Sequence, residues 1–403
     1  MRLLLRYLLL LAAGTVAVVL TAMIPRHAVE SHLRTSINHL ATQEEYPTAF
    51  GLPLLKTDNF TDLLMLNEAW CSDNAHPVNA AMLNNYFLTV DGDLFKASQL
   101  MLTKPVEQFQ LSEYSRYWHG IQVVLRPLLV LTDYRHLIIA NCILLSLLAL
   151  WCLYEVWQHC SPALSIVFAV TLLLVAFPAV PLCIQYSVCF YIMFAFVIAL
   201  LRSKEQRHDA CSFFTVGALT AFFDLLTTPL LTLGIPLLIY MCNFREHDRM
   251  KRVTQLVVSW FVGYAVFWLS KCLVALLLTG HNILGFFMDG VVARSLLGLN
   301  TLRHSLASHP VLCFATTVLT CFLIYFGMRR LLQMARQNAF LQQYGWLLFV
   351  AAMPILWFAL LLQHTSVHFF FVWRTLAITL LAAMMLLIPS IRSNLKTTSY
   401  HDE

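Results

Sequence analysis

The sequence predicts an all-α integral membrane protein with about ten transmembrane helices and a large extracytoplasmic loop lobe after the first helix. Apolar residues make up 59% of the 403 residues and charged residues only 12%. The mean hydropathy of +0.71 lies well above that of a soluble domain. A bilayer-spanning helix needs roughly 20 mostly apolar residues. The candidate runs are 7–24, 136–157, 162–180, 184–201, 211–226, 227–243, 254–279, 309–328, 345–363 and 369–389.

These runs divide the chain into four parts. Residues 1–24 form an N-terminal membrane anchor, because the first run is long for a cleaved signal peptide. Residues 25–120 form the lobe, residues 121–390 a multispan membrane domain and residues 391–403 a cytoplasmic tail. The fifth and sixth apolar runs are short and could form one broken element.

Lysine and arginine concentrate in alternate connections, which sets the expected orientation. The two termini and the loops near 202–207, 245–252 and 329–336 are rich in basic residues, whereas acidic residues outnumber basic ones in the lobe. The positive-inside rule therefore predicts a multi-pass protein of the cell membrane (plasma or inner), with both termini cytoplasmic and the lobe outside.

The composition also argues against several classes of protein and site. The net charge of +5 mostly reflects the inward-facing anchors, and no interleaving of basic and aromatic residues predicts a nucleic-acid partner. The 11 cysteines lie almost entirely in or beside apolar runs, which makes a disulfide framework unexpected. No cysteine or histidine spacing indicates a zinc site.

Two carboxylates in the lobe are the first candidate catalytic residues. If Asp58 opens a helix, Asp62 lies about one turn later and both can face the same way. Such a pair can act as a base or bind a divalent cation. The alternative is that Asp58 is only an N-cap and Asp62 a first-turn acid favoured by the helix dipole.

A second acidic element, Asp91 and Asp93 around a glycine, has the spacing with which many glycosyltransferases hold a metal or a sugar phosphate. The same residues are typical of a tight turn. A metal at these two residues is therefore only a weak possibility.

The end of the lobe combines aromatic, basic and histidine residues before an amphipathic stretch. Trp118, His119 and Arg126 belong to this segment, and Pro127 follows directly. Aromatic rings at the interface with basic groups reaching phosphates would suit a lipid-linked substrate. The alternative is an ordinary interfacial belt that anchors the protein.

Ionisable residues within the apolar runs form the third group of candidates. An ionisable group at bilayer depth costs on the order of 3 kcal/mol, so each should have a partner or a purpose. Asp224 lies at the turn of an apolar hairpin, Lys271 lies inside the seventh run, and Arg374 follows His364 and His368. The alternatives are a hairpin cap, a snorkelling lysine and a structural ion pair. Under the predicted orientation all of them fall towards the outer face.

This layout resembles the membrane glycosyltransferases of the GT-C superfamily, which use polyprenyl-phosphate-linked sugars on the outer side of the membrane. It also resembles a largely unassigned group of bacterial multispan proteins. The motifs that carry the resemblance are the stretch 58–62, Trp118-His119-Gly120 with Leu125-Arg126-Pro127, Asp224 beside Pro229, and the segment 364–374.

The resemblance implies transfer of a sugar from a polyprenyl-phosphate donor to an extracytoplasmic glycan, lipid or cell-wall acceptor. Asp58 or Asp62 would be the general base. Arg126, Arg374 and Lys271 would hold the donor phosphate, with His364 and His368 assisting. No cofactor is firmly implied, and a divalent cation is possible.

Two other functions remain open at this level. In a transporter or flippase of a lipid-linked glycan, the same basic groups would bind phosphate and the acids would couple to protons. Such proteins usually contain paired repeats or matched broken helices, and the sequence offers a single break. A non-catalytic subunit of an envelope assembly would tolerate changes at the candidate residues.

Overall fold

The computed structural model describes residues 2–52, 55–89, 91–203, 209–243, 248–285, 288, 339–388 and 390–391. These ranges contain helices and no strand, apart from two isolated bridges. Six of the described helical stretches are long and apolar enough to cross a membrane, which confirms an all-α protein of membrane character. They are Leu3–Ala22, Tyr134–His159, Ile184–Arg202, Arg249–Thr279, Phe340–Leu360 and Phe369–Leu387.

Three predicted spans take a different form. The run 162–180 is a helix, α8 (Pro162–Leu174), followed by a 3-10 segment, η3 (Phe177–Leu182), because Pro178 and Pro181 cannot continue a regular helix. The runs 211–226 and 227–243 are two short helices, α10 (Asp209–Phe223) and α11 (Leu231–Asn243). The run 309–328, and the tail beyond residue 391, lie outside the described residues.

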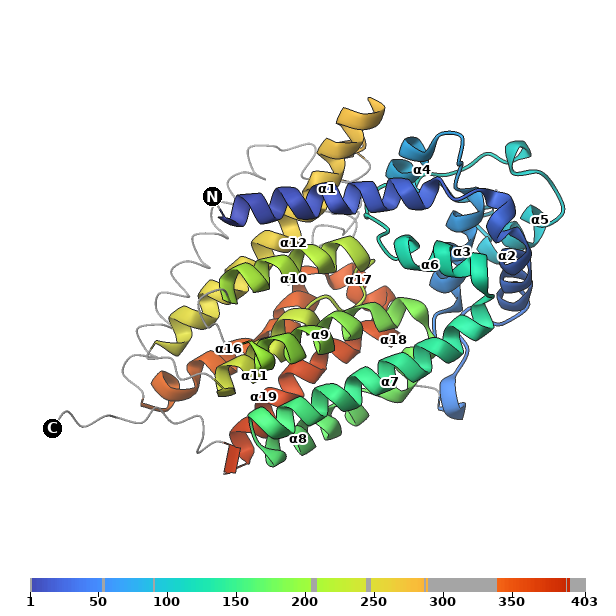
Figure 1. The fold of residues 1–403 in the computed structure, drawn as a ribbon. Helices are drawn as coiled ribbons and strands as arrows, with labels where there is room; N and C mark the ends of the chain where they lie inside the picture. The colour runs from blue at the N-terminus through green and yellow to red at the C-terminus, as the bar shows by residue number, and fades with distance from the viewer. Residues whose placement is uncertain are drawn as a thin grey trace, which may run out of the picture.

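The lobe is a group of short helices at one end of the bundle (Figure 1). Leu33, Ile37, Leu63 and Leu66 are fully buried in a lobe core that also includes Leu125. Leu125 belongs to α6, which therefore packs with the lobe and starts the return to the bundle. The lobe elements are α2 (Arg26–Ala41), η1 (Ala49–Gly51), α3 (Asn59–Cys71), α4 (Pro77–Leu83), α5 (Leu94–Met101), η2 (Val106–Gln108) and α6 (Gln122–Leu131).

The bundle packs around a central helix, α9 (Ile184–Arg202), which is buried along most of its length. A stripe on α7 at helical spacing, Leu145, Ala149, Cys152 and Val156, is buried in the same core. The other bundle elements are α1 (Arg2–Ala22), α7 (Tyr134–His159), α12 (Arg249–Thr279), α16 (Ala339–Leu360), α17 (Leu362–Val367), α18 (Phe369–Val372), η6 (Trp373–Leu376) and α19 (Ala377–Leu387).

Two glycines let α10 and α12 touch backbone to backbone. A Cβ on Gly217 would lie 2.1 Å from the Trp260 carbonyl oxygen, and a Cβ on Gly263 would lie 2.1 Å from the Phe214 carbonyl oxygen. Without an apolar driving force between helices in lipid, such close packing of small residues is a main source of association.

Gly217→Ala and Gly263→Ala are each expected to force these helices apart and to lower the thermal unfolding midpoint in detergent. Gly345→Ala is the matched control, since its Cβ would meet only a flexible Met250 side chain at 3.6 Å. Equal midpoints for all three variants, measured by fluorescence-detected unfolding, would contradict this packing.

Candidate functional site

Asp62 holds the lobe on the bundle. Its carboxylate accepts hydrogen bonds from the backbone N–H groups of Ile184 at 2.9 Å and Gln185 at 3.1 Å, and from the Tyr134 hydroxyl at 2.5 Å. These N–H groups open α9 and have no partner within that helix. Burial raises the pKa of Asp62, and the hydrogen bonds oppose the rise. Asp62 therefore caps a helix that lies about 120 residues later in the chain, a contact that its own sequence neighbourhood does not reveal.

Asp58 is the N-cap of α3, as the alternative interpretation of the sequence expects. Its two oxygens accept from the backbone N–H of Thr61 at 2.8 Å and from the Thr61 hydroxyl at 2.7 Å. Burial raises the pKa of Asp58 to about 6, against the lowering effect of these hydrogen bonds. The carboxylate thus titrates near neutral pH, but both oxygens are engaged.

Asp91 and Asp93 adopt the turn arrangement. Asp93 caps α5 by accepting from the Lys96 backbone N–H at 2.9 Å, and Gly92 between the two acids has a φ of +80°. The Lys96 ammonium lies 3.0 Å from Asp93 and 3.6 Å from Asp91. No group of three or more potential metal ligands occurs in the described parts of the chain.

The segment 364–374 packs against the turn between α10 and α11. His364 Nε2 lies 2.9 Å from the Leu226 carbonyl oxygen, while Asp224 closes this turn by accepting from the backbone N–H and hydroxyl of Thr227. The His368 ring lies 4.7 Å from that of His364. These three candidates therefore belong to one polar connection at the lobe end of the bundle.

Arg374 is buried beside the same connection. Its guanidinium lies over the Tyr186 ring at 4.9 Å and donates to the Phe370 carbonyl oxygen at 3.2 Å. Its Nε and Nη2 atoms have no hydrogen-bond partner among the residues that the structure describes. Tyr186 follows the Asp62-capped start of α9, so Arg374 lies towards the N-terminal end of α3.

The other candidates gather near the C-terminal end of α3. The Trp118 indole donates to the Phe267 carbonyl oxygen at 2.8 Å, and the Lys271 ammonium lies 5.8 Å from the Trp118 ring centroid. His119 has a φ of 52°, an arrangement that costs about 1 kcal/mol or more and is often found at functional sites. Gly120 follows, and a Cβ there would lie 2.4 Å from the Phe222 ring.

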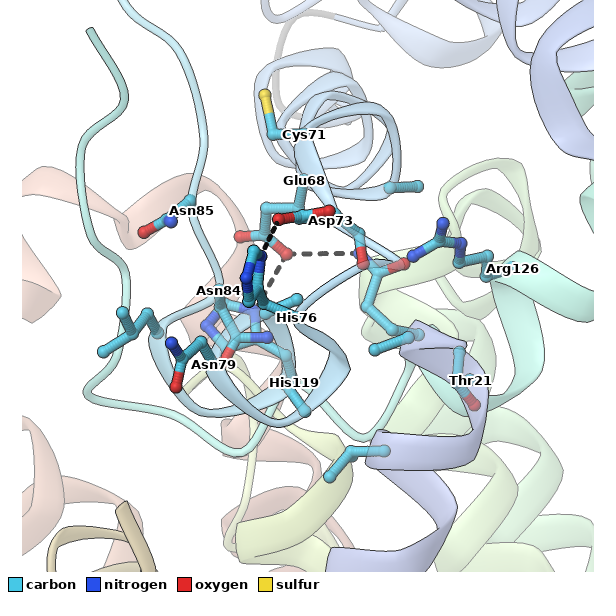
Figure 2. Close-up of a pocket in the computed structure, with 18 of the residues that line it drawn as sticks. Thr21, Glu68, Cys71, Asp73, His76, Asn79, Asn84, Asn85, His119 and Arg126 are labelled. Atoms are coloured by element: carbon cyan, nitrogen blue, oxygen red, sulfur yellow. Dashed lines mark hydrogen bonds and ion pairs between the residues drawn. The ribbon is translucent and has the colours of Figure 1, made fainter. Parts of the chain in front are cut away.

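Two of the candidates, His119 and Arg126, line a cavity of about 280 Å³, which we call the α3–α6 pocket (Figure 2). It lies between the C-terminal ends of α1 and α3, helix α4 and helix α6. Its lining residues are Val18, Thr21, Ala22, Glu68, Ala69, Cys71, Ser72, Asp73, His76, Asn79, Ala80, Ala81, Leu83, Asn84, Asn85, Leu111, His119, Gln122 and Arg126.

A carboxylate that sequence reasoning missed, Glu68, lies at the floor of this pocket. Its Oε2 is 3.0 Å from His119 Nδ1 and accepts from Gln122 Nε2 at 3.2 Å. Within the described part of the chain its Oε1 has no hydrogen-bond partner. The Tyr114 carbonyl oxygen, 2.8 Å from His119 Nε2, can only accept and so fixes a proton on Nε2. His119 Nδ1 is therefore the ring nitrogen that faces Glu68.

Arg126 supplies an uncompensated cation on the pocket wall. The side chain is 2% exposed, and its guanidinium donates to the Ile24 carbonyl oxygen at 2.7 Å, while Nε has no acceptor in the described ranges. Among the described residues no carboxylate lies within ion-pair distance of it. Burial, with a smaller effect from Arg26, lowers the pKa of Arg126 to about 10, which leaves it charged at neutral pH.

Lys271, on α12, contacts Asn84, which lines the pocket. Its ammonium donates to the Asn84 side-chain oxygen at 2.6 Å, to the Tyr117 carbonyl oxygen at 2.6 Å and to the Ala81 carbonyl oxygen at 3.5 Å. The candidate residues thus form two groups at the two ends of α3. Ten residues of helix separate Asp58 from Glu68, or about 15 Å.

No family model matches the chain, and neither a curated protein nor a solved structure shows significant similarity to it.

Proposed function

We propose that the chain is an extracytoplasmic glycosyltransferase that moves a sugar from a polyprenyl-phosphate donor to a glycan, lipid or cell-wall acceptor, with the α3–α6 pocket as its reaction site. The observation that carries this proposal is the pocket lining, where Glu68, His119 and Arg126 are all buried and each keeps a polar atom with no hydrogen-bond partner among the described residues. Buried charged groups with free hydrogen-bonding capacity in a concave site are typical of catalytic centres.

The size and lining of the pocket favour a single sugar unit. A volume of about 280 Å³ lies at the lower end of the range for ligand sites. Asn79, Asn84 and Asn85 offer amide groups along the lining (Figure 2), and the amide of Gln122, a buried residue, belongs to the same lining. Amide, carboxylate and guanidinium groups suit the hydroxyl groups and phosphate of a sugar phosphate.

In the proposed reaction Glu68 is the general base. Its free Oε1 takes the proton of the acceptor hydroxyl, and the acceptor oxygen attacks the anomeric carbon of the donor sugar. The bond from that carbon to the phosphate oxygen breaks, and the polyprenyl phosphate leaves with the electron pair. Arg126 stabilises the charge that develops on the phosphate, while His119 Nδ1 can receive the proton from Glu68. The anomeric configuration is inverted.

Glu68 is a better general base than Asp58 or Asp62 for a geometric reason. Both oxygens of Asp58 and of Asp62 are occupied by hydrogen bonds within the lobe or between the lobe and the bundle, whereas Glu68 Oε1 has no partner among the described residues. We keep Asp58 as the alternative base, since its pKa of about 6 suits proton transfer at neutral pH.

Transport of a lipid-linked glycan is the second candidate function. The buried Asp224 between the short helices α10 and α11 favours it, since transporters bind their substrates at broken helices. In that function Arg126 would still bind the phosphate, but Glu68 would carry a coupling proton instead of an acceptor proton.

Arg126→Met is expected to weaken binding of polyprenyl-phosphate sugars to the purified protein by more than tenfold, because a bidentate guanidinium contact to phosphate would be lost. Arg126→Lys should retain part of the affinity as a point charge. Arg374→Met is the matched control at the other end of α3. Scintillation proximity binding with a radiolabelled donor measures all three. A loss of donor affinity in Arg374→Met with none in Arg126→Met would contradict the assignment and place the phosphate beside Arg374.

A further inference from the structure

Lys271 has an unusual environment for a buried cation. Its side chain is fully buried, and all three ammonium protons have oxygen acceptors from Ala81, Asn84 and Tyr117. No carboxylate within the described residues lies at ion-pair distance from its Nζ. The charge is thus compensated by amide dipoles, two from the backbone and one from a side chain, and it does not point into the pocket as a phosphate ligand would require.

The contact with Lys271 fixes the orientation of the Asn84 side chain. An ammonium group only donates, so the atom that faces it at 2.6 Å must be the Asn84 oxygen and not the amide nitrogen. The Asn84 backbone is fixed as well, because this residue ends α4 with a φ of 50° and its N–H bonds to the Ala80 carbonyl oxygen. Asparagine is among the few residues that adopt this conformation readily.

The free side of the Asn84 amide therefore carries two N–H donors. Asn84 lines the α3–α6 pocket, and no partner of its Nδ2 is found among the described residues. Arg126 Nε, elsewhere in the lining, is a donor that has no acceptor among the described residues. Glu68 Oε1, also without a partner there, is an acceptor. The pocket thus presents donors on two sides and an acceptor at the bottom.

We propose that Lys271 is a positioning residue and Asn84 a specificity-determining residue, which together select a hydroxyl-bearing sugar unit by donating to one of its ring hydroxyl oxygens. This inference rests on the proposed function only in taking the pocket as the sugar site. The sugar oxygen accepts from Asn84 Nδ2 on one side, while Arg126 is left for the phosphate oxygens. The lysine on the seventh predicted span acts through the asparagine and does not touch the substrate.

The test compares the affinities of polyprenyl-phosphate hexoses with those of their monodeoxy analogues, measured as binding without any acceptor. Wild type is expected to bind the parent donor at least about tenfold more tightly than one particular monodeoxy analogue, because loss of that oxygen leaves the Asn84 donors unpaired. Asn84→Asp keeps the oxygen that faces Lys271 and removes the two N–H donors. The ratio of the parent donor's affinity to that of the monodeoxy analogue should therefore fall to near one.

Lys271→Met removes the cation at similar side-chain length and frees the Asn84 amide to turn. The ratio of the parent donor's affinity to that of the monodeoxy analogue should fall in this variant as well. Asn38→Asp, at an exposed position of α2 outside the pocket lining, is the matched control and should keep the ratio. A purely structural role would change folded yield but leave the ratio unchanged in the folded fraction.

The outcomes separate this inference from the proposed function. An unchanged ratio in Asn84→Asp overturns the assignment of Asn84 and Lys271, whatever the turnover. A ratio that falls as expected while wild type shows binding and no sugar transfer leaves the assignment in place and contradicts the transferase. If wild type binds none of the donors, both are overturned.

Discussion

Replacing Glu68 by glutamine is expected to lower the turnover number for sugar transfer by about 10²–10⁴-fold. Glutamine keeps the shape of the side chain and an oxygen towards Gln122 and His119, but it cannot take the proton of the acceptor hydroxyl. Donor affinity should change only a few-fold, because the phosphate is assigned to Arg126. Initial rates with a radiolabelled donor, together with direct binding of that donor, separate the two effects.

Asp58→Asn is the matched variant for this experiment. Asparagine is as good an N-cap as aspartate, so α3 should be preserved and activity should remain near that of wild type. The reverse pattern, with full activity in Glu68→Gln and none in a well-folded Asp58→Asn, would contradict the role of Glu68 and identify Asp58 as the general base.

Asp62→Ala is expected to cause the largest loss of stability, on the order of 3 kcal/mol or more. The substitution leaves two backbone N–H groups at the start of α9 and the Tyr134 hydroxyl buried without an acceptor. Each such group costs about 1–3 kcal/mol when it is left unpaired. The unfolding midpoint in detergent, or the denaturant needed to unfold the protein, measures the loss.

Asp62→Asn should be milder, because it keeps one oxygen acceptor for the donors around it. Thr61→Ala is a control in the same turn, since it removes one hydrogen bond to Asp58 and leaves the start of α9 capped. A midpoint for Asp62→Ala equal to that of Thr61→Ala would show that Asp62 does not join the lobe to the bundle.

The membrane character and the lobe were predictable from the sequence, because long apolar runs and the excess of acids after the first run are local properties. The helix breaks near Pro178, Pro181 and Pro229 follow from proline chemistry. The alternative interpretation of Asp58 as an N-cap and Asp62 as a first-turn acid was also available from the sequence.

The arrangement of the site could not be predicted in the same way. Asp62 owes its role to α9, and Lys271 contacts a residue 187 positions away. Such pairings depend on tertiary packing. Glu68 could not be recognised as a candidate because the residues before Asn67 and Glu68 are apolar and predict a buried helix. Its neighbour Asn67 also faces inward and donates to the Phe87 carbonyl oxygen. The signal that could have revealed Glu68 is this polar pair within an apolar helix, since both buried side chains need hydrogen-bond partners.

The most direct measurement is sugar release from a panel of radiolabelled polyprenyl-phosphate sugars by the protein purified in detergent, with crude envelope material as acceptor. The proposal predicts turnover of at least one donor by wild type, with the label recovered in a product, and its loss in Glu68→Gln. Binding of a donor without turnover of any would contradict the transferase and favour transport.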